Sequence, residues 1–110
     1  MLQFTAMSTF VLIHGAWHGA WCWRKVTSRL EKLGHRVVAP DLPGLGDDRT
    51  PVERVSLPMW TRHVCDILDA ESEPVILVGH SRGGIVLSEV AEQRPDKIRA
   101  LVYLTAFLVR

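Results

Sequence analysis

The sequence predicts an α/β fold, a doubly wound parallel sheet of about four strands with helices on both faces. Three observations lead to this prediction. Four short apolar runs alternate with segments whose apolar residues recur at helical spacing. The runs are continuously apolar, which is typical of parallel strands buried on both faces. The 110 residues, 47% hydrophobic and 23% charged, have the size and composition of one soluble domain.

The first half of the chain is expected to contain two strands and one helix. The β-branched and aromatic run Thr9–Ile13 predicts a first strand, and residues 36–39 predict a second, which ends at Pro40. Between them, apolar side chains at helical spacing precede Gly34, which stands where a helix C-cap belongs. The residues of this helical pattern are Trp23, Val26, Leu30 and Leu33.

The second half continues the alternation after a polar loop that contains Asp47 and Asp48, which are read as solvated. An amphipathic helix is expected over residues 57–68, with Pro58 tolerated in its first turn. Residues 75–78 predict a third strand, and a third helix is expected to end near Arg94. A fourth strand is expected over 98–107, so the whole order is βαβαβαβ. Ligands of such sheets bind at the carboxyl ends of strands, where strand order reverses.

Charge and composition exclude several classes of protein. The net charge is only +1 and Lys and Arg do not cluster, so no nucleic-acid partner is expected. The two cysteines, Cys22 and Cys65, are read as reduced, mostly buried side chains. The start of the chain lacks the pattern of a secretory signal, and the longest apolar run, 100–109, is too short to span a bilayer. We therefore expect a cytoplasmic protein with no membrane partner.

The strongest motif is Gly79-His80-Ser81-Arg82-Gly83-Gly84, which follows the third predicted strand. It fits G-x-S-x-G between a strand and a helix, the pattern of a nucleophile elbow. Such a turn is so sharp that Ser81 is strained and exposed at its tip, while Gly79 and Gly83 let strand and helix approach closely. Ser81 is therefore the predicted catalytic nucleophile.

A nucleophilic serine needs hydrogen-bond donors for the oxyanion that forms on attack. One expected donor is the backbone N–H of Arg82, at the amino end of the following helix. The loop after the first strand is expected to supply the second, and the Ala16 N–H is the candidate.

Three segments together resemble the α/β-hydrolase fold: the strand followed by His14-Gly15, the turn beginning Asp41-Leu42-Pro43-Gly44, and GHSRGG. The loop His14-Gly15-Ala16-Trp17-His18-Gly19-Ala20-Trp21 is similar to the esterase and hydroxynitrile lyase branch that includes plant methylesterases. The resemblance implies hydrolysis of small, fairly apolar esters without cofactor or metal. It also implies that residues 1–110 form a single partial domain, without the cap and the C-terminal strands.

In that family the acid and the histidine of the triad follow the serine, after later strands. None of the five histidines of this chain is a convincing substitute for the missing base. His14 is expected to hydrogen-bond within its loop, and His80 to pack beside Ser81. Trp17, His18 and His80 are candidates for lining a substrate pocket, although Trp17, Trp21 and Trp23 are better explained by packing of the first helix. Asp41 is expected to cap a turn.

Two functions of different classes remain. The first is a serine hydrolase acting on small carboxylic esters, with little or no turnover by the isolated 110-residue chain; a hydroxynitrile lyase of the same fold is an alternative within this class. The second is a non-catalytic binding or interaction module that keeps the elbow. In addition, the uncharged strand expected over 98–107 would be an exposed edge in this chain, which predicts self-association.

Overall fold

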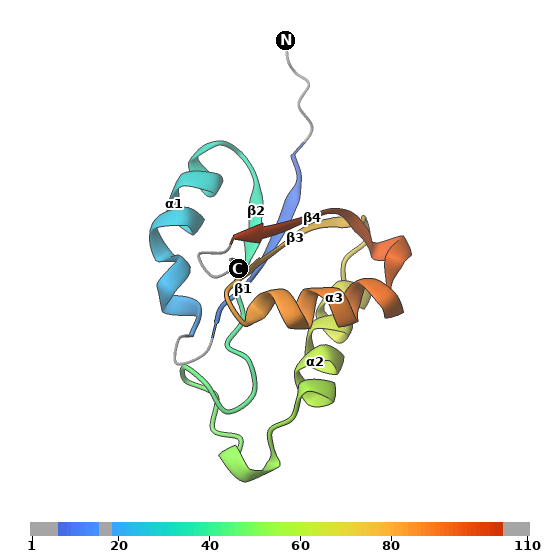
Figure 1. The fold of residues 1–110 in the computed structure, drawn as a ribbon. Coiled ribbons are helices and arrows are strands. Elements are labelled where there is room, and N and C mark those ends of the chain that lie inside the picture. Colours follow the sequence, from blue (N-terminus) through green and yellow to red (C-terminus); the bar gives the residue numbers. More distant parts are fainter. Residues whose placement is uncertain (1–6, 16–18, 105–110) are drawn as a thin grey trace.

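The computed structural model describes residues 7–15 and 19–104. Four parallel strands form one sheet in the order β2-β1-β3-β4. Three α-helices accompany it, with α1 on one side of the sheet and α2 and α3 on the other (Figure 1). The predicted fold class is therefore confirmed.

The strands are β1 (Thr9–Ile13), β2 (Arg36–Val38), β3 (Val75–His80) and β4 (Ile98–Leu104). The third strand is two residues longer than its apolar run, because Gly79 and His80 pair with Tyr103 and Leu104 of β4. β1 lies between β2 and β3 in the sheet. After β2 the chain therefore crosses back past β1 to form β3. The carboxyl ends of β1 and β3 consequently meet where strand order reverses. Of the range expected for the fourth strand, residues 105–107 lie outside the described residues.

The helices are α1 (Arg24–Lys32), α2 (Leu57–Asp69) and α3 (Gly83–Gln93). Short 3-10 turns precede α1 (Ala20–Trp23), α2 (Val52–Arg54) and β4 (Pro95–Lys97). The Ser56 hydroxyl caps α2 by accepting a hydrogen bond from the Met59 N–H at 3.3 Å. Beyond α1, Gly34 has a φ of 92°, a left-handed conformation that suits glycine after a helix.

Alternate residues of the strands supply two separate apolar layers. Val11 and Ile13 of β1 point into the larger layer, beneath α2 and α3, with Leu77 of β3. Leu12 of β1 and Val78 of β3 point to the opposite face, where Trp23 covers them. Side chains that are fully buried in the larger layer and come from the helices are Val64, Leu68, Leu87 and Val90.

The face predicted for α1 is only partly correct. Trp23 is buried and Leu30 packs against its layer, but Val26 and Leu33 are exposed, and Trp21 is 57% exposed. Trp23 packs with Leu12 and Val78, and partly buried residues that include Leu30 and Cys22 complete this layer. Packing of the first helix therefore rests on Trp23 and not on Trp21.

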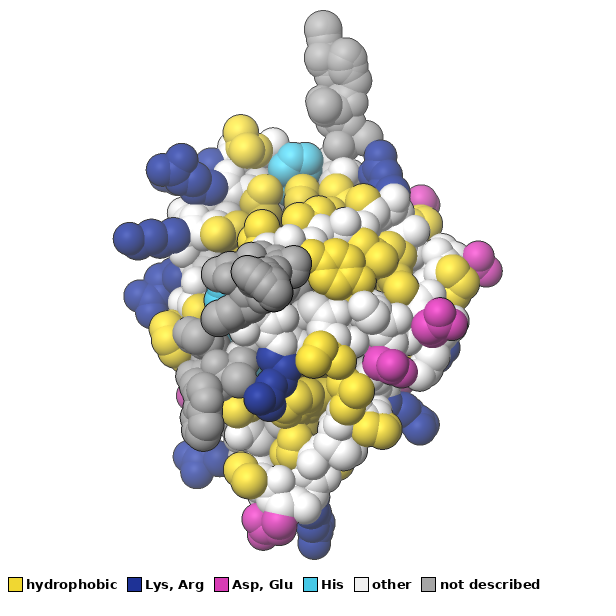
Figure 2. All heavy atoms as spheres, viewed as in Figure 1, with side chains coloured by type: hydrophobic (Ala, Val, Ile, Leu, Met, Phe, Trp, Pro, Cys, Tyr) yellow, Lys and Arg dark blue, Asp and Glu magenta, His cyan; other side chains and the backbone are white. Residues whose placement is uncertain are grey.

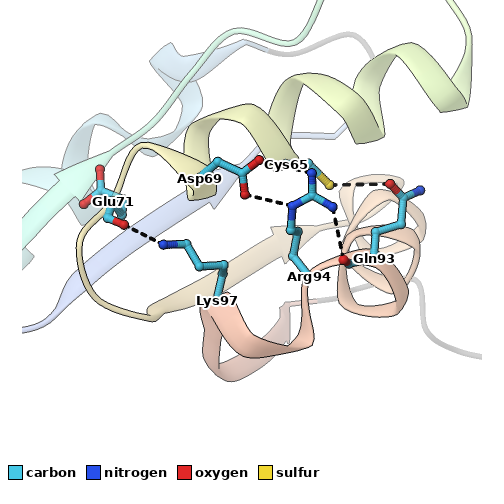
Figure 3. A network of polar contacts seen from close by, with 6 residues as sticks. All are labelled: Cys65, Asp69, Glu71, Gln93, Arg94 and Lys97. Atoms are coloured by element: carbon cyan, nitrogen blue, oxygen red, sulfur yellow. Dashed lines mark hydrogen bonds and ion pairs between the residues drawn. The ribbon is translucent and has the colours of Figure 1, made fainter.

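Polar contacts join the C-terminal ends of α2 and α3 (Figure 3). Arg94 donates two hydrogen bonds to the Asp69 carboxylate, at 2.8 and 3.1 Å, and holds the pKa of that carboxyl below its ordinary value. The Lys97 ammonium donates to the Glu71 carbonyl at 2.6 Å. These contacts hold the segment that joins α3 to β4 against the C-terminal end of α2. The Cys65 thiol, buried in α2, lies 3.9 Å from the Gln93 side-chain oxygen, and burial raises its pKa.

The two edges of the sheet differ sharply. At one edge, β2 is three residues long, and its Arg36 is paired with Glu71 at 2.9 Å. At the other, β4 is seven residues long and leaves four uncharged side chains between 36% and 45% exposed, namely Leu101, Val102, Tyr103 and Leu104. Hydrophobic side chains gather over β4 in the space-filling view (Figure 2). Among the described residues, none of the helices is both long and apolar enough to cross a membrane.

Candidate active site

The loop after β1 touches the turn after β3 at the point where strand order reverses. A Cβ atom at Gly15 would lie 3.0 Å from the Ser81 Cβ and 3.4 Å from the Ser81 Oγ. A Cβ atom at Gly83 would lie 2.8 Å from the Ile13 carbonyl oxygen. Glycine at these two positions therefore lets the backbones meet, and Ser81 stands in the crevice that such sheets offer to ligands.

Ser81 has a φ of 59°, and it is the only residue other than glycine with a positive φ in the described part of the chain. This left-handed conformation costs about 1–2 kcal/mol for an L residue. The turn is held by two backbone hydrogen bonds, from the Ser81 N–H to the Leu104 carbonyl at 3.2 Å and from the Gly84 N–H to the Ser81 carbonyl at 2.9 Å. The surrounding structure thus maintains a strained serine at the end of β3.

Gly79 and Gly83 lie on either side of this serine and bring β3 and α3 together. A Cβ atom at Gly79 would lie 2.6 Å from the Leu87 Cδ1 and 3.0 Å from the backbone carbon and oxygen of Gly83. No side chain larger than hydrogen fits at Gly79 without displacing a neighbour.

Arg82 follows at the amino end of α3, and its side chain is exposed. Within the described part of the chain, its backbone N–H has no acceptor, as is usual for the first amides of a helix. The first turn of α3 therefore offers an unused donor and the positive end of a helix dipole beside Ser81.

The two described histidines nearest this turn have different surroundings. His14 is fully buried; its Nδ1 lies 2.9 Å from the Gly15 carbonyl oxygen, and its Nε2 accepts the Leu42 N–H at 3.0 Å. The expectation that His14 bonds within its loop is confirmed. His80 is half-buried and meets the Trp23 ring edge to face, with centroids 6.3 Å apart. The other predicted residues of this loop, Ala16, Trp17 and His18, lie outside the described residues.

An apolar recess of about 240 Å³ borders Arg82. The Trp60 indole forms part of its wall and is fixed by a hydrogen bond from Nε1 to the Pro43 carbonyl at 2.8 Å. Trp60 lies in the amphipathic helix expected over residues 57–68, and nothing in the local sequence shows that its ring reaches the loop after β2. The remaining lining residues are Gly44, Leu45, Val52 and Val55.

The loop between β2 and α2 is more ordered than its polar sequence suggested. Asp48 was expected to be solvated, but it is half-buried and accepts the N–H groups of Gly44 and Thr50 at 2.9 and 2.8 Å. Hydrogen bonds from the Thr50 hydroxyl and these two amides lower the pKa of Asp48 to about 2. Asp41 accepts the N–H groups of Asp47 and Ala20, so the turn cap expected there also reaches the loop after β1.

Within residues 7–15 and 19–104, no histidine or carboxylate side chain is hydrogen-bonded to the Ser81 hydroxyl. In the same described ranges, no group of three or more His, Cys, Asp or Glu side chains is placed so that it could hold a metal ion. The described residues therefore combine a strained serine, an unused helix amide and an apolar recess, without a general base at the serine.

The chain is similar to curated esterases and, at 44% identity over 102 residues, to an alpha-hydroxynitrile lyase of Arabidopsis thaliana. It is 48% identical over 104 residues to a carbendazim hydrolyzing esterase from a Nocardioides strain, covering 93% of this chain and 43% of that protein. It is 44% identical over 103 residues to Methylesterase 2 of Arabidopsis thaliana, covering 90% and 39%. The chain thus spans about two fifths of the length of these relatives.

A solved structure of similar fold is an extracellular α/β-hydrolase from a Paenibacillus species. It superimposes with a TM-score of 0.79 at 40% identity, over 87% of this chain and 39% of that one. The model of the alpha/beta hydrolase family matches residues 10–110. By sequence and by fold, this chain belongs to the alpha/beta hydrolase family.

Proposed function

We propose that the protein is a serine hydrolase that acts on small, apolar carboxylic esters, with Ser81 as its nucleophile. One observation carries the proposal: Ser81 is held at a φ of 59° in a tight strand-to-helix turn, at the carboxyl edge of the sheet. Strain at a single polar residue in a crevice is typical of functional sites. The esterase names of the relatives favour the same chemistry.

In the proposed mechanism, the Ser81 Oγ attacks the ester carbonyl carbon and forms a C–O bond. The carbonyl π electrons move to oxygen, and the resulting oxyanion is stabilised by the N–H groups of Arg82 and Ala16. Collapse of this intermediate expels the alcohol, which takes up the proton that Ser81 gave to a general base that the described residues do not supply. Water then attacks the acyl-enzyme, releases the acid and restores the serine.

The recess beside Arg82 favours an apolar group in the substrate, because its described walls are mainly aliphatic and aromatic. Trp17, His18 and His80 remain proposed pocket residues. No base stands at Ser81 among the described side chains, so we expect little or no turnover by residues 1–110 alone. The mechanism uses no cofactor or metal.

The test is covalent labelling of the 110-residue chain with a fluorophosphonate in excess over several hours, read by intact mass. We expect one label on the parent, added slowly because the oxyanion donors act without a base, and none on Ser81→Ala. Ser88→Ala is the matched control, because Ser88 is an exposed serine of α3 whose hydroxyl bonds to Tyr103 at 3.0 Å. It should label as the parent does. Labelling of Ser81→Ala to the same extent as the parent would contradict the proposal.

The absence of a base at Ser81 within the described residues favours a second candidate, a non-catalytic binding module. Turnover of a p-nitrophenyl ester that disappears in Ser81→Ala would eliminate this candidate. Stoichiometric labelling without any turnover is the outcome expected for the proposed hydrolase in the form of the isolated chain.

A further inference from the structure

The apolar recess beside Arg82 is built mainly by the two limbs of one loop. Residues 43–45 lie on the limb that follows β2, and Val52 and Val55 lie on the limb that leads to α2. Trp60 of α2 completes the wall. The shape of the recess therefore depends on how the two limbs are held together.

Asp48 lies between the two limbs in sequence and ties them to each other. Its Oδ1 accepts the Gly44 N–H at 2.9 Å and the Thr50 N–H at 2.8 Å. The Thr50 hydroxyl also bonds to this carboxylate, and these hydrogen bonds hold the pKa of Asp48 at about 2. The carboxylate is therefore ionised at neutral pH, and an ionised acceptor forms stronger hydrogen bonds than a neutral one.

Two further contacts set the width of the recess. Gly44 has a φ of 84°, and a Cβ atom there would lie 2.6 Å from the Val55 Cγ2, so the limbs approach with no room for a side chain between them. The Trp60 Nε1–H donates to the Pro43 carbonyl at 2.8 Å. The recess is thus preformed, and a ligand that enters it does not have to order the loop.

The recess lies directly beside the turn that holds the serine. Arg82, which is part of its wall, follows Ser81 in sequence, so the two Cα atoms are about 3.8 Å apart. Arg82 and Trp60 also border a narrow void together with Gly15, and a Cβ atom at Gly15 would lie 3.0 Å from the Ser81 Cβ. A group bonded to a carbonyl carbon at Ser81 therefore has to extend past only one residue to enter the recess.

The size of the recess suits one ring. An enclosed apolar cavity of about 150 Å³ takes one benzene molecule, so a recess of about 240 Å³ has room for a ring with a short substituent. We propose that this recess selects the substrate: it takes one aromatic or cyclic apolar group of the ester, and Asp48 holds the recess in the shape that receives this group. Asp48 is a positioning residue, since it does not line the recess itself. The inference rests on the proposed function and adds to it the kind of apolar group that the substrate carries.

The test compares two sulfonyl fluorides that differ by one ring, methanesulfonyl fluoride and phenylmethanesulfonyl fluoride. With either reagent, the serine oxygen forms a bond to sulfur, fluoride leaves and the hydroxyl proton passes to water; intact mass of the 110-residue chain gives the rate. The selectivity ratio is the labelling rate with the phenyl reagent over that with the methyl reagent, divided by the same ratio for their hydrolysis in buffer. Both reagents react with the same folded population, so partial unfolding of a variant does not change this ratio.

Two variants disturb the recess, and each has a matched control. Asp48→Ala releases the two limbs, whereas Asp47→Ala makes the same change at the preceding side chain, which forms no hydrogen bond in the described part of the chain. Gly44→Ala drives a methyl group against Val55. Its control is Gly34→Ala, because Gly34 has a similar φ of 92° and a Cβ atom there meets nothing within 4 Å.

We expect a selectivity ratio of about ten or more for the parent, because even one methylene group in an apolar pocket discriminates by about that factor. The ratio should fall by about fivefold or more in Asp48→Ala and in Gly44→Ala. In Asp47→Ala and Gly34→Ala it should stay within about twofold of the parent.

A parent ratio near one, or no reaction with phenylmethanesulfonyl fluoride while the fluorophosphonate labels Ser81, would overturn this inference and leave the proposed function standing. An unchanged ratio in both Asp48→Ala and Gly44→Ala would overturn it as well. If neither the sulfonyl fluorides nor the fluorophosphonate labelled the parent, or if Ser81→Ala were labelled equally, the proposed function would be wrong and the inference would be wrong with it.

Discussion

Replacing Gly79 by alanine should destabilise the folded chain, because the turn at Ser81 depends on the close approach of β3 and α3. The new methyl group would lie 2.6 Å from the Leu87 Cδ1 and 3.0 Å from the backbone carbon and oxygen of Gly83. Leu87 is fully buried, so its methyl group has no free space to enter, and the Gly83 backbone is tied into α3. Both neighbours resist displacement.

Overpacking of this kind costs about 1–3 kcal/mol. With a urea dependence of about 1.5 kcal/mol per molar for a chain of this size, the midpoint of unfolding should fall by about 0.7–2 M. The assay is urea unfolding of the 110-residue chain, followed by tryptophan fluorescence and circular dichroism.

Gly84→Ala is the matched control, because Gly84 lies in the first turn of α3, on the other side of Ser81. There the added Cβ meets only the edge of the Tyr103 ring at 3.1 Å, and this ring is exposed and can move. Alanine is favoured over glycine in a helix by about 0.5–1 kcal/mol, so the control should be as stable as the parent or more stable. Equal urea midpoints for Gly79→Ala and the parent would refute the reasoning.

Two further changes test other parts of the molecule. The pKa of Asp48 is about 2 in the folded chain, below its unfolded value near 4, so the ionised carboxylate adds stability above pH 4 that is lost as the pH falls towards 2. Asp48→Asn should therefore lower the urea midpoint at pH 7 and reduce the difference between the midpoints at pH 7 and pH 3; an undiminished difference would assign the acid sensitivity to other groups. On the open edge, Val102→Lys places a charge on β4, where Val102 is 37% exposed, and should reduce self-association in sedimentation velocity. A parent chain that is already monomeric would remove the basis of this prediction.

Local patterns were enough to predict most elements of the fold. The apolar runs predicted all four strands, and the glycines around Ser81 predicted a tight turn between strand and helix, because both signals are carried by neighbouring residues. The length of β3 was underestimated, since Gly79 and His80 become strand only by pairing with β4. The apolar face of α1 was overestimated, because periodicity does not show that Trp23 and Leu30 reach the layer of Leu12 and Val78 while Val26 and Leu33 stay exposed.

The contacts around the candidate site are less visible in the sequence. Asp41 was correctly read as a turn cap, but its bond to Ala20 joins residues that are 21 positions apart. The recess beside Arg82 depends in the same way on the Trp60 ring reaching Pro43 from another element. Local spacing identifies a residue's type of chemistry, whereas its long-range partners are set by the packing of the whole sheet.

One backbone hydrogen bond joins the turn that holds Ser81 to β4, the strand at the edge of the sheet. The Ser81 N–H donates to the carbonyl of Leu104, the last residue of β4. The backbone of the serine is thus anchored on an edge strand, which has a neighbour on one side only within the described residues. Any segment that pairs with the open side of β4 would stiffen this anchor as well as bury the apolar side chains. Occupancy of the edge and reactivity of the serine should consequently rise together.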